Sequence, residues 1–226
     1  MIERSKRFIQ SAKNLAAGLP ARWRRAVRAL ADDLRAGHCD TQRPPERCLD
    51  SLLAAIGALD RAGKVVIIPG HGLCQSGARH MLLRLSEHLR KTGKIVRLAI
   101  HPAAGWFPGH MLALLGEADN LLTAVAPINQ TLAASDLALI VGACDIVNPG
   151  LSQVEGPDQR MHRVLQVENA TDIVVCNQDF LPGPSGARSI LYENPRTIFL
   201  PGDAWQTLQT LIDSLVPPGR NGCAGG

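Results

Sequence analysis

Short runs of apolar residues alternate with amphipathic stretches over most of the 226-residue chain. The apolar runs predict buried strands, because each is too short for a helix and most are followed closely by glycine, proline or short polar residues. The expected strands span residues 65–68, 95–100, 121–125, 137–141, 173–176 and 197–200. Apolar positions at helical spacing predict helices over 76–91, 108–118, 129–134 and 204–215. This alternation predicts an α/β fold, a doubly wound parallel sheet of about six strands with helices on both faces.

A different pattern precedes the first strand. Residues 1–36 have apolar positions three and four apart, interrupted at Pro20, and predict a helical segment with one strongly basic side. Residues 38–47 include two adjacent prolines and indicate a linker, and residues 48–62 predict a helix that ends at Gly63. We therefore expect an N-terminal helical arm and linker over residues 1–61, a sheet-bearing unit over 62–216 and a flexible tail over 217–226.

The positive charge of the chain is concentrated in the arm. The net charge is +4, and residues 1–61 hold 12 Lys and Arg against 7 Asp and Glu. The rest of the chain is almost neutral, with 12 basic and 13 acidic residues. Either the basic side of the arm is simply solvated, or it contacts an acidic partner, a membrane surface or nucleic acid. For the protein as a whole we expect no nucleic-acid partner.

Cysteine use and hydropathy favour a cytoplasmic location. The six cysteines are scattered without a Cys-x-x-Cys pair, which is typical of reduced thiols. No run reaches the roughly 18 apolar residues of a membrane span, and the N-terminus lacks the apolar core of a signal peptide. No cluster of histidine, cysteine and carboxylate residues has the spacing of metal ligands, so no metal site is expected.

Glycine, proline and short polar residues follow five of the six predicted strands. In a doubly wound, Rossmann-like sheet, ligands bind at the carboxyl ends of the strands, so these positions are candidate site residues. The candidates are Gly70, His71, Gly72, Leu73, Cys74, Gln75 and Ser76 after the first strand; Ala103, Ala104, Gly105, Trp106 and Phe107 after the second; Gly142, Ala143, Cys144, Asp145, Asn148 and Pro149 after the fourth; Asn177, Gln178 and Asp179 after the fifth; and Gly202, Asp203 and Ala204 after the sixth. Together they predict a pocket in which a flat, phosphate-bearing ligand lies along the backbone.

The turn after the first strand has the composition of a phosphate-binding turn. A strand, a Gly-x-Gly turn at Gly70 and Gly72 and a helix can bring backbone N–H groups to a phosphate, because no side chain blocks the approach. We expect the amides of these two glycines, beside the bend at residues 104–105, to cradle a diphosphate. The usual dinucleotide fingerprint is incomplete, because Gln75 replaces its third glycine and no acidic residue ends the second strand.

Taken in order, these loops resemble the NADP(H)-binding domain, domain III of the beta-subunit type, of the proton-translocating NAD(P) transhydrogenases. The resemblance covers residues 64–215. Its most specific part is the run His-Pro-x-Ala-Gly-x-x-Pro-Gly-His-Met at residues 101–111. Shorter runs also carry it, at Gly142-Ala143-x-Asp145 and at Gly202-Asp203-Ala204.

This resemblance implies a role in hydride exchange. Domains of this family bind NADP(H) on a parallel sheet and receive a hydride from NADH held by a partner domain, while a membrane domain couples the exchange to proton movement. It implies that the chain is an NADP(H)- or NAD(H)-binding component of such an exchange, inactive alone. The implied partners are an NADH-binding domain and a membrane domain on other chains, which would place the protein at the periphery of the inner membrane. Hydride transfer between two nicotinamides needs no general acid or base, so no catalytic residue is expected.

The resemblance also implies what each loop contacts. The glycine turn and the bend at residues 104–105 embrace the pyrophosphate, and the loop at residues 142–149 reaches the nicotinamide side, where Asp145 matches an acidic residue. Residues 177–179 match a Lys-Arg-Ser run that binds the 2′-phosphate. Residues 183–186 match a Gly-Tyr-Ala-Gly lid over the cofactor.

The chain departs from this family at the 2′-phosphate. Asn177 and Gln178 replace two cations, and Asp179 adds a negative charge. A charge-assisted contact is worth roughly 1.5–3 kcal/mol, so losing two weakens NADP(H) binding by orders of magnitude. We therefore expect a preference for NAD(H), unless Arg160, Arg163, Arg188 or Arg196 supplies the missing charge. The alternative is a divergent nucleotide-binding or sensor module without catalysis.

Several candidates have a simple structural interpretation beside the functional one. Asp145 either binds the ligand or caps the helix after the fourth strand. His71 either stacks on the ligand or is an ordinary loop histidine. Trp106 either stacks on the ligand or packs in the core. Cys144 is either reactive or a small apolar filler. Trp106 and Pro184 replace the arginine and the lid tyrosine of the family pattern.

Overall fold

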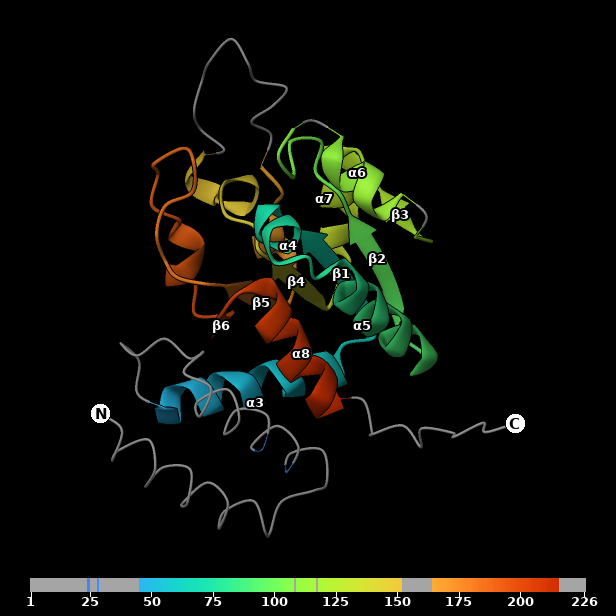
Figure 1. Cartoon of the computed structure of the whole chain (residues 1–226), viewed down its shortest axis with the longest axis vertical. Helices are drawn as coiled ribbons and strands as arrows, with labels where there is room; N and C mark the ends of the chain where they lie inside the picture. The colour runs from blue at the N-terminus through green and yellow to red at the C-terminus, as the bar shows by residue number, and fades with distance from the viewer. Residues whose placement is uncertain are drawn as a thin grey trace.

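The computed structural model describes residues 24, 28, 45–107, 109–116, 118–151 and 164–215. Its centre is a sheet of six parallel strands in the order β3-β2-β1-β4-β5-β6 (Figure 1). The strands are β1 (Lys64–Pro69), β2 (Ile95–Ala99), β3 (Leu121–Leu122), β4 (Leu137–Val141), β5 (Asp172–Asn177) and β6 (Thr197–Pro201). The predicted α/β fold with a Rossmann-like parallel sheet is confirmed.

The central strands are apolar on both faces because both faces of the sheet are covered. In β1, Val65 and Ile67 belong to one core cluster, and the residues that alternate with them belong to the other. β4 and β5 divide their side chains in the same way. Since the strands are parallel, their carboxyl ends meet at one edge, where Pro69 of β1 pairs in register with Val141 of β4.

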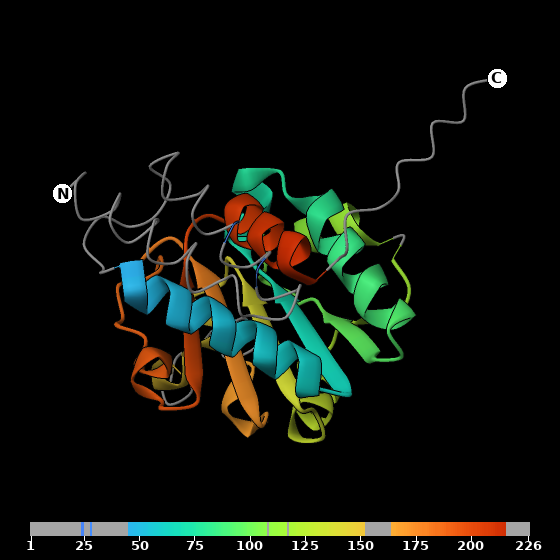
Figure 2. The same ribbon diagram turned by 90° about the horizontal axis from the view of Figure 1, so that it is seen from below.

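One face of the sheet carries most of the described helices. They are α3 (Pro45–Arg61), α4 (His71–Ser76), α5 (Arg79–Lys91), α6 (His110–Leu115) and α8 (Ala204–Leu215). All five bury side chains in the larger core cluster. Figure 2 shows α3 crossing the strands with α8 beside it.

The opposite face is covered by α7 (Val125–Ala133) and by the long connections after β4 and β5. These connections contain short 3-10 helices at Val167–Asn169 and Ile190–Glu193. Val167 and Leu191 of these turns are buried in the second core cluster. Loops that start at the carboxyl edge of the sheet therefore also cover one of its faces.

Helix boundaries differ from the predicted ones near glycines. The helix predicted over residues 76–91 is α5 and begins later, at Arg79, because Gly77 adopts a left-handed φ of 64° and ends a separate helix, α4, which the sequence did not predict. The helix predicted from residue 108 begins after Gly109, which has a φ of 83°. The third strand is shorter than predicted, since Val125 already opens α7.

Helix α3 packs with the sheet, although the sequence placed it in the arm. Its side chains Leu52, Ile56 and Leu59 lie in the larger core cluster. The helix starts at Pro45, inside the predicted linker, because a proline suits the first turn, where its missing N–H costs no bond. By packing, residues 45–61 belong to the sheet-bearing unit.

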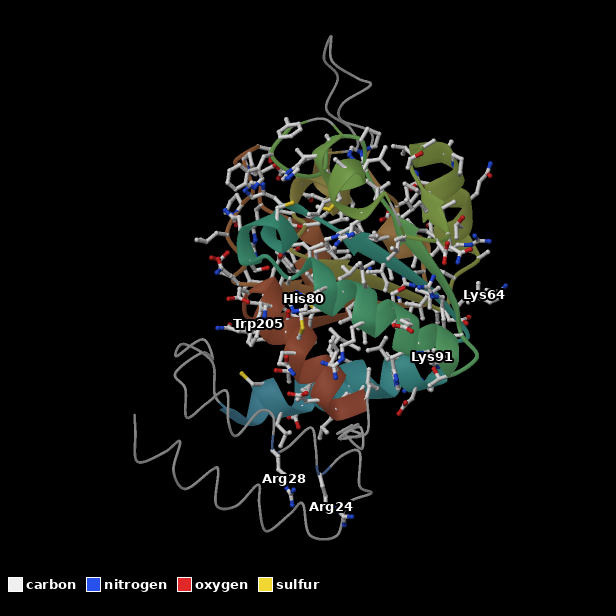
Figure 3. The ribbon with its side chains drawn as sticks, turned by 45° about the vertical axis from the view of Figure 1, so that its right-hand side comes forward. Arg24, Arg28, Lys64, His80, Lys91 and Trp205 are labelled. Carbon is white, nitrogen blue, oxygen red and sulfur yellow. The ribbon has the colours of Figure 1, made fainter. Side chains whose placement is uncertain are left out.

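Most of the predicted arm lies outside the described residues. Arg24 and Arg28 are described, and both are helical and exposed. Their side chains point away from the packed body in Figure 3. The rest of residues 1–44 and the predicted tail over 217–226 lie outside the described ranges.

The helices that the structure describes are short. The longest, α3, has 17 residues. Within the described ranges, none has both the length and the hydropathy needed to cross a bilayer.

One carboxylate joins the amino ends of two central strands. Asp136 precedes β4, and its Oδ2 accepts hydrogen bonds from the backbone N–H groups of Gly63 and Lys64, each 2.8 Å long. Because Lys64 opens β1, these bonds connect β1 and β4 outside their ladder. The hydrogen bonds from Lys64 and Gly63 favour the charged carboxylate and hold the pKa of Asp136 below its usual value.

We predict that Asp136→Asn lowers the free energy of unfolding at neutral pH and has less effect in acid. The pKa of Asp136 is lowered in the folded state, so its carboxylate stabilises the fold above the unfolded pKa, and this contribution is lost as pH falls through the folded pKa. Urea unfolding of both proteins at neutral pH and at about pH 3 should show a difference that narrows in acid. Asp119→Asn, at another exposed aspartate, is the control. An equal effect of Asp136→Asn at both pH values would contradict the prediction.

Candidate functional site

A cavity opens at the carboxyl edge of the sheet, at the point where the strand order reverses. The connection after β1 leads to β2 on one side, and the connection after β4 leads to β5 on the other. The cavity measures about 760 Å³, within the range of about 300–1,000 Å³ typical of small-molecule sites. Loops after β1, β2, β4, β5 and β6 form its wall. Helix α4, which is labelled in Figure 1, begins just after β1 and contributes four of its residues to the wall.

The cavity gathers residues from all five predicted loops. The candidates that line it are Gly70, His71, Gly72, Gln75, Ser76, Ala103, Ala104, Gly105, Trp106, Gly142, Ala143, Cys144, Asp145, Asn177, Gln178, Asp179, Gly202, Asp203 and Ala204. Sequence reasoning located these positions because parallel strands bring their carboxyl ends to one edge.

The remaining candidates lie outside the cavity wall for reasons of packing. Leu73 is fully buried in the core, and Cys74 packs against the same cluster. Asn148 is buried and hydrogen-bonds to backbone groups of two loops, and Pro149 begins the next 3-10 turn. Phe107 is exposed and turns its ring toward an imidazole of α6.

Sequence reasoning missed four residues of the wall, Ile146, Cys176, Leu181 and Pro182. Pro184 also lines the cavity, and it belongs to the run that the resemblance assigned to a lid. Cys176 lies within β5, next to its last residue, and the sequence-based search considered only the residues that follow each strand. The prolines mark the loop after β5 as a turn but do not show where it folds, which depends on contacts with the loop after β4.

The turns after β1 and β4 meet backbone to backbone. The N–H of Gly70 donates to the Val141 carbonyl and the N–H of Gly72 to the Gly142 carbonyl, both at 2.9 Å. A Cβ added to Gly72 would lie 2.8 Å from the Cα of Gly142, and one added to Gly142 would lie 2.6 Å from the Cα of Gly72. Gly142 also has a left-handed φ of 66°. The packing of the two turns therefore requires these glycines.

The prediction of which backbone amides donate to a diphosphate was wrong. The sequence assigned that role to the amides of Gly70 and Gly72, but both N–H groups are already bonded within the protein. The backbone N–H groups of His71 and Gly105 also border the cavity, and they have no hydrogen-bond partner among the described residues. They come from the same two bends and are available to a ligand.

A buried histidine shapes the bend after β2. His101 is 2% exposed, and its Nδ1 accepts a hydrogen bond from the N–H of Ala103 at 3.0 Å. At the other end of the bend, the N–H of Trp106 donates to Nδ1 of His110 at 3.2 Å. The bend is thereby held on both sides, and the rings of Trp106 and His71 approach with centroids 5.8 Å apart.

A polar network lies under the loop that the resemblance assigns to the 2′-phosphate. The Nδ2 of Asn177 donates to the Ala143 carbonyl and to Oη of Tyr192, both at 2.9 Å. The Sγ of Cys144 lies 3.8 Å from the same hydroxyl. Burial raises the pKa of Cys144 and of Tyr192, and raises the pKa of Cys176 to about 12. The thiols therefore stay protonated at neutral pH, which favours the interpretation of Cys144 as a small apolar filler. The two hydrogen bonds of Asn177 connect the end of β5 to the turn after β4.

Asp145 fastens the loop after β5 over the cavity. Its Oδ2 accepts the N–H of Ser185 and its Oδ1 accepts the hydroxyl of Ser185, both at 2.8 Å. Gly183 lies so close that an added Cβ would be 2.6 Å from Oδ1 of Asp145. We call this pair of bonds the Asp145–Ser185 latch. It is a use of Asp145 that neither interpretation from the sequence included.

The described wall of the cavity is acidic. Asp145, Asp179 and Asp203 line it, and no Lys or Arg is among the described lining residues. Asp203 forms a capping box with Gln206, in which Oδ1 accepts the N–H of Gln206 and the N–H of Asp203 donates to the Gln206 side chain. Asp179 accepts a hydrogen bond from the N–H of Leu181 at 2.9 Å.

The described arginines named as substitute cations are engaged elsewhere. Arg196 precedes β6, at the amino edge of the sheet, and donates to two backbone carbonyls before β5. Arg188 pairs with Glu193 at 3.1 Å. Arg160 and Arg163 lie outside the described residues.

We predict that Gly142→Ala destabilises the fold more than Gly77→Ala. The two glycines have nearly the same φ, 66° and 64°, so both variants carry similar backbone strain. Only at Gly142 would the new Cβ also meet backbone atoms, since nothing lies within 4 Å of a Cβ at Gly77. Urea unfolding should show an additional loss of about 1–3 kcal/mol, the usual cost of overpacking. Equal losses in the two variants would mean that the turns separate without cost.

We also predict that breaking the latch loosens the loop over the cavity. Ser185→Ala removes the hydroxyl that donates to Asp145, and Asp145→Asn replaces one of the two accepting oxygens. Amide hydrogen exchange at residues 181–187 should therefore speed up several-fold in both variants. Glu193→Gln, which removes an exposed ion pair nearby, is the control. Unchanged exchange in both latch variants would show that other contacts hold the loop.

Comparison with known proteins identifies the family. Residues 45–214 match the family model described as NAD(P) transhydrogenase beta subunit. Two sequences of NAD(P) transhydrogenase subunit beta from Rhodospirillum rubrum are 31% identical to this chain over 160 residues. The aligned part is 70% of this chain and 34% of each relative, so the chain spans only a third of the length of these curated relatives.

Solved structures are more distant. A thiamine diphosphate-dependent 4-hydroxybenzoylformate decarboxylase from Rhodococcus jostii matches 76% of this chain and 28% of its own, with 20% identity and a TM-score of 0.45. Similarity at that level carries no information about function. The match of the family model extends from the first residue of α3 into the last turn of α8. The chain belongs to the NAD(P) transhydrogenase beta subunit family.

Proposed function

We propose that the cavity binds a nicotinamide dinucleotide, and that the chain is the nucleotide-binding component of a transhydrogenase-like hydride exchange. The observation that carries this proposal is the position of the cavity. It lies at the switch point between β1 and β4 and is bordered by the glycine turn and the bend after β2. A bound nicotinamide would supply or accept the hydride.

The residues at the cavity fit such a ligand. Its volume suits a molecule of this class, and the free amides of His71 and Gly105 are candidate donors to the diphosphate. The glycines and alanines on the wall leave the backbone accessible along the length of the cavity. Five separate loops contribute to one continuous wall, which suits an elongated ligand.

We infer that the preferred cofactor is NAD(H) rather than NADP(H). A 2′-phosphate would meet Asp179 beside Gln178, on a wall where the described lining residues provide three aspartates and neither Lys nor Arg. Asn177 cannot simply take the place of a cation, because its amide is bonded to Ala143 and Tyr192. An unpaired dianionic phosphate in this setting would be repelled, whereas a free 2′-hydroxyl could donate to a carboxylate.

The proposed exchange requires other chains. One cavity holds one dinucleotide, so the second nicotinamide has to come from an NADH-binding domain that docks at the cavity mouth. The curated relatives are about three times as long as the part matched here, in keeping with a membrane domain elsewhere in the assembly. We propose that the protein is cytoplasmic and works at the periphery of the inner membrane, with residues 1–44 as its basic arm.

The second candidate function is a nucleotide-binding or sensor module without catalysis. The Asp145–Ser185 latch favours it, because the carboxylate assigned by resemblance to the nicotinamide side is bonded to the protein through both oxygens. Adding a purified NADH-binding domain of a transhydrogenase and following the transfer of deuterium from NADH deuterated at C4 to the second nucleotide by mass spectrometry would separate the two candidates. Transfer above the rate of either protein alone would exclude the sensor.

We predict tighter binding of NAD⁺ and NADH than of NADP⁺ and NADPH by isothermal titration calorimetry. The double variant Gln178→Arg/Asp179→Ser should raise the affinity for NADP⁺ by about tenfold or more, since one charge-assisted contact is worth about 1.5–3 kcal/mol. Asn177 is left in place because it braces the wall.

The matched control is Gln209→Arg/Asp213→Ser on α8. It makes the same two replacements and the same change of net charge at an exposed pair that does not line the cavity. No binding of any of the four nucleotides at millimolar concentration would overturn the proposal. An unchanged NADP⁺ affinity in the cavity variant would place residues 178–179 away from the 2′ position.

A further inference from the structure

Trp106 is a large apolar side chain that the fold leaves exposed at the edge of the cavity. It is 66% exposed and lines the cavity, whereas its exposed neighbour Phe107 does not. Its indole is therefore not part of the core, so the interpretation of Trp106 as a core residue was wrong. An exposed tryptophan that borders a ligand-sized cavity is accessible to a ligand bound there.

The backbone that carries Trp106 is firmly held. Gly105 has a left-handed φ of 102°, and a Cβ there would lie 3.1 Å from His110, so the chain passes close to α6. The N–H of Trp106 donates to Nδ1 of His110, and the N–H of His110 donates to the Phe107 carbonyl at 3.0 Å. The indole is thus presented from a fixed bend, which lowers the entropy cost of binding a ligand against it.

A second ring faces the same part of the cavity. His71, on the turn after β1, lies with its ring centroid 5.8 Å from that of Trp106 at an interplanar angle of 35°. The rings are tilted and not stacked in parallel, so the imidazole does not cover the indole as a stacking partner would. Residues of the β1 and β2 loops thereby form an open aromatic pair at the cavity.

We propose that Trp106, with His71 beside it, is a stacking subsite for a flat heteroaromatic ring of the bound nucleotide. This inference rests on the proposed function. The free amides of His71 and Gly105 lie on the same two bends, so a diphosphate held there would place one of the ligand's rings near the indole. Stacking of a base on an aromatic side chain is worth about 1–3 kcal/mol and tolerates any flat ring.

The chemistry of stacking is the same for adenine and for nicotinamide. Both are flat heteroaromatic rings with an accessible π-face. The two halves of the dinucleotide, AMP and nicotinamide mononucleotide, therefore identify which ring uses the subsite. The half that stacks on Trp106 should lose affinity when the indole is removed, and the other half should not.

The test is isothermal titration of NAD⁺ into the full chain and its variants, followed by the two mononucleotides. We expect Trp106→Ala to weaken NAD⁺ binding by about 5- to 150-fold, and Trp106→Phe to recover most of it. Phe107→Ala is the matched control, because it removes an exposed aromatic ring from the same loop but outside the cavity wall. Since Trp106 is exposed, these replacements open no hole in the core.

A second readout is tryptophan fluorescence. A ring stacked on the indole should quench the emission, and this quenching should vanish in Trp106→Phe but persist in Trp205→Phe, at the tryptophan of α8 labelled in Figure 3. NAD⁺ binding that is equal in the wild type and in Trp106→Ala would overturn the subsite while leaving the proposed function intact, as expected if the indole anchors a protein partner. Failure of the wild type to bind any of the four nucleotides would overturn both.

Discussion

The structure depends on one close backbone contact, between the turn at Gly70 and Gly72 and the turn at Gly142. The two turns approach to distances that no side chain permits, and two backbone hydrogen bonds join them. This contact joins the carboxyl ends of β1 and β4 at the point where the chain turns to opposite sides of the sheet. The loops after β1 and β4 start from this contact, and Asn177 at the end of β5 donates to the Ala143 carbonyl beside it.

The contact also changes the meaning of the glycine turn. A Gly-x-Gly sequence after a strand suggests a backbone left open for a phosphate, yet here the glycines make room for another turn of the same chain. The amides of His71 and Gly105, on the bends after β1 and β2, have no hydrogen bond within the part of the chain that the structure describes. A glycine-rich turn therefore predicts a close approach of backbone, and the tertiary structure decides what approaches it.

The polar side chains of the cavity mostly bond to the protein itself. Asn177 braces the ends of two strands, Asp203 caps α8, and Asp145 fastens a loop. Each bond reduces what that side chain can offer a ligand, because a carboxylate or amide already bonded has fewer directions left. What remains on the wall is backbone, aromatic surface and negative charge.

This combination bears on the proposed choice between NAD(H) and NADP(H). Membership follows from the match over residues 45–214, and that match does not specify the ligand. The proposed preference rests on the charge at the cavity, since a phosphate without cationic partners is repelled by carboxylates in a confined space. The three aspartates on the wall are thus the physical basis for the proposed preference for NAD(H).

The strands, their order along the chain and the loops at their carboxyl ends could all be predicted from the sequence. Apolar runs of this length can be buried only inside a covered sheet, and parallel strands must share an edge. Tertiary structure alone decided the rest. The apolar side of α3 is buried against the sheet, the side chain of Leu73 is in the core and that of Trp106 is exposed. Ser185 contacts Asp145, which lies 40 residues earlier in the chain. Such contacts are long-range, and no local pattern specifies which side chain will meet which.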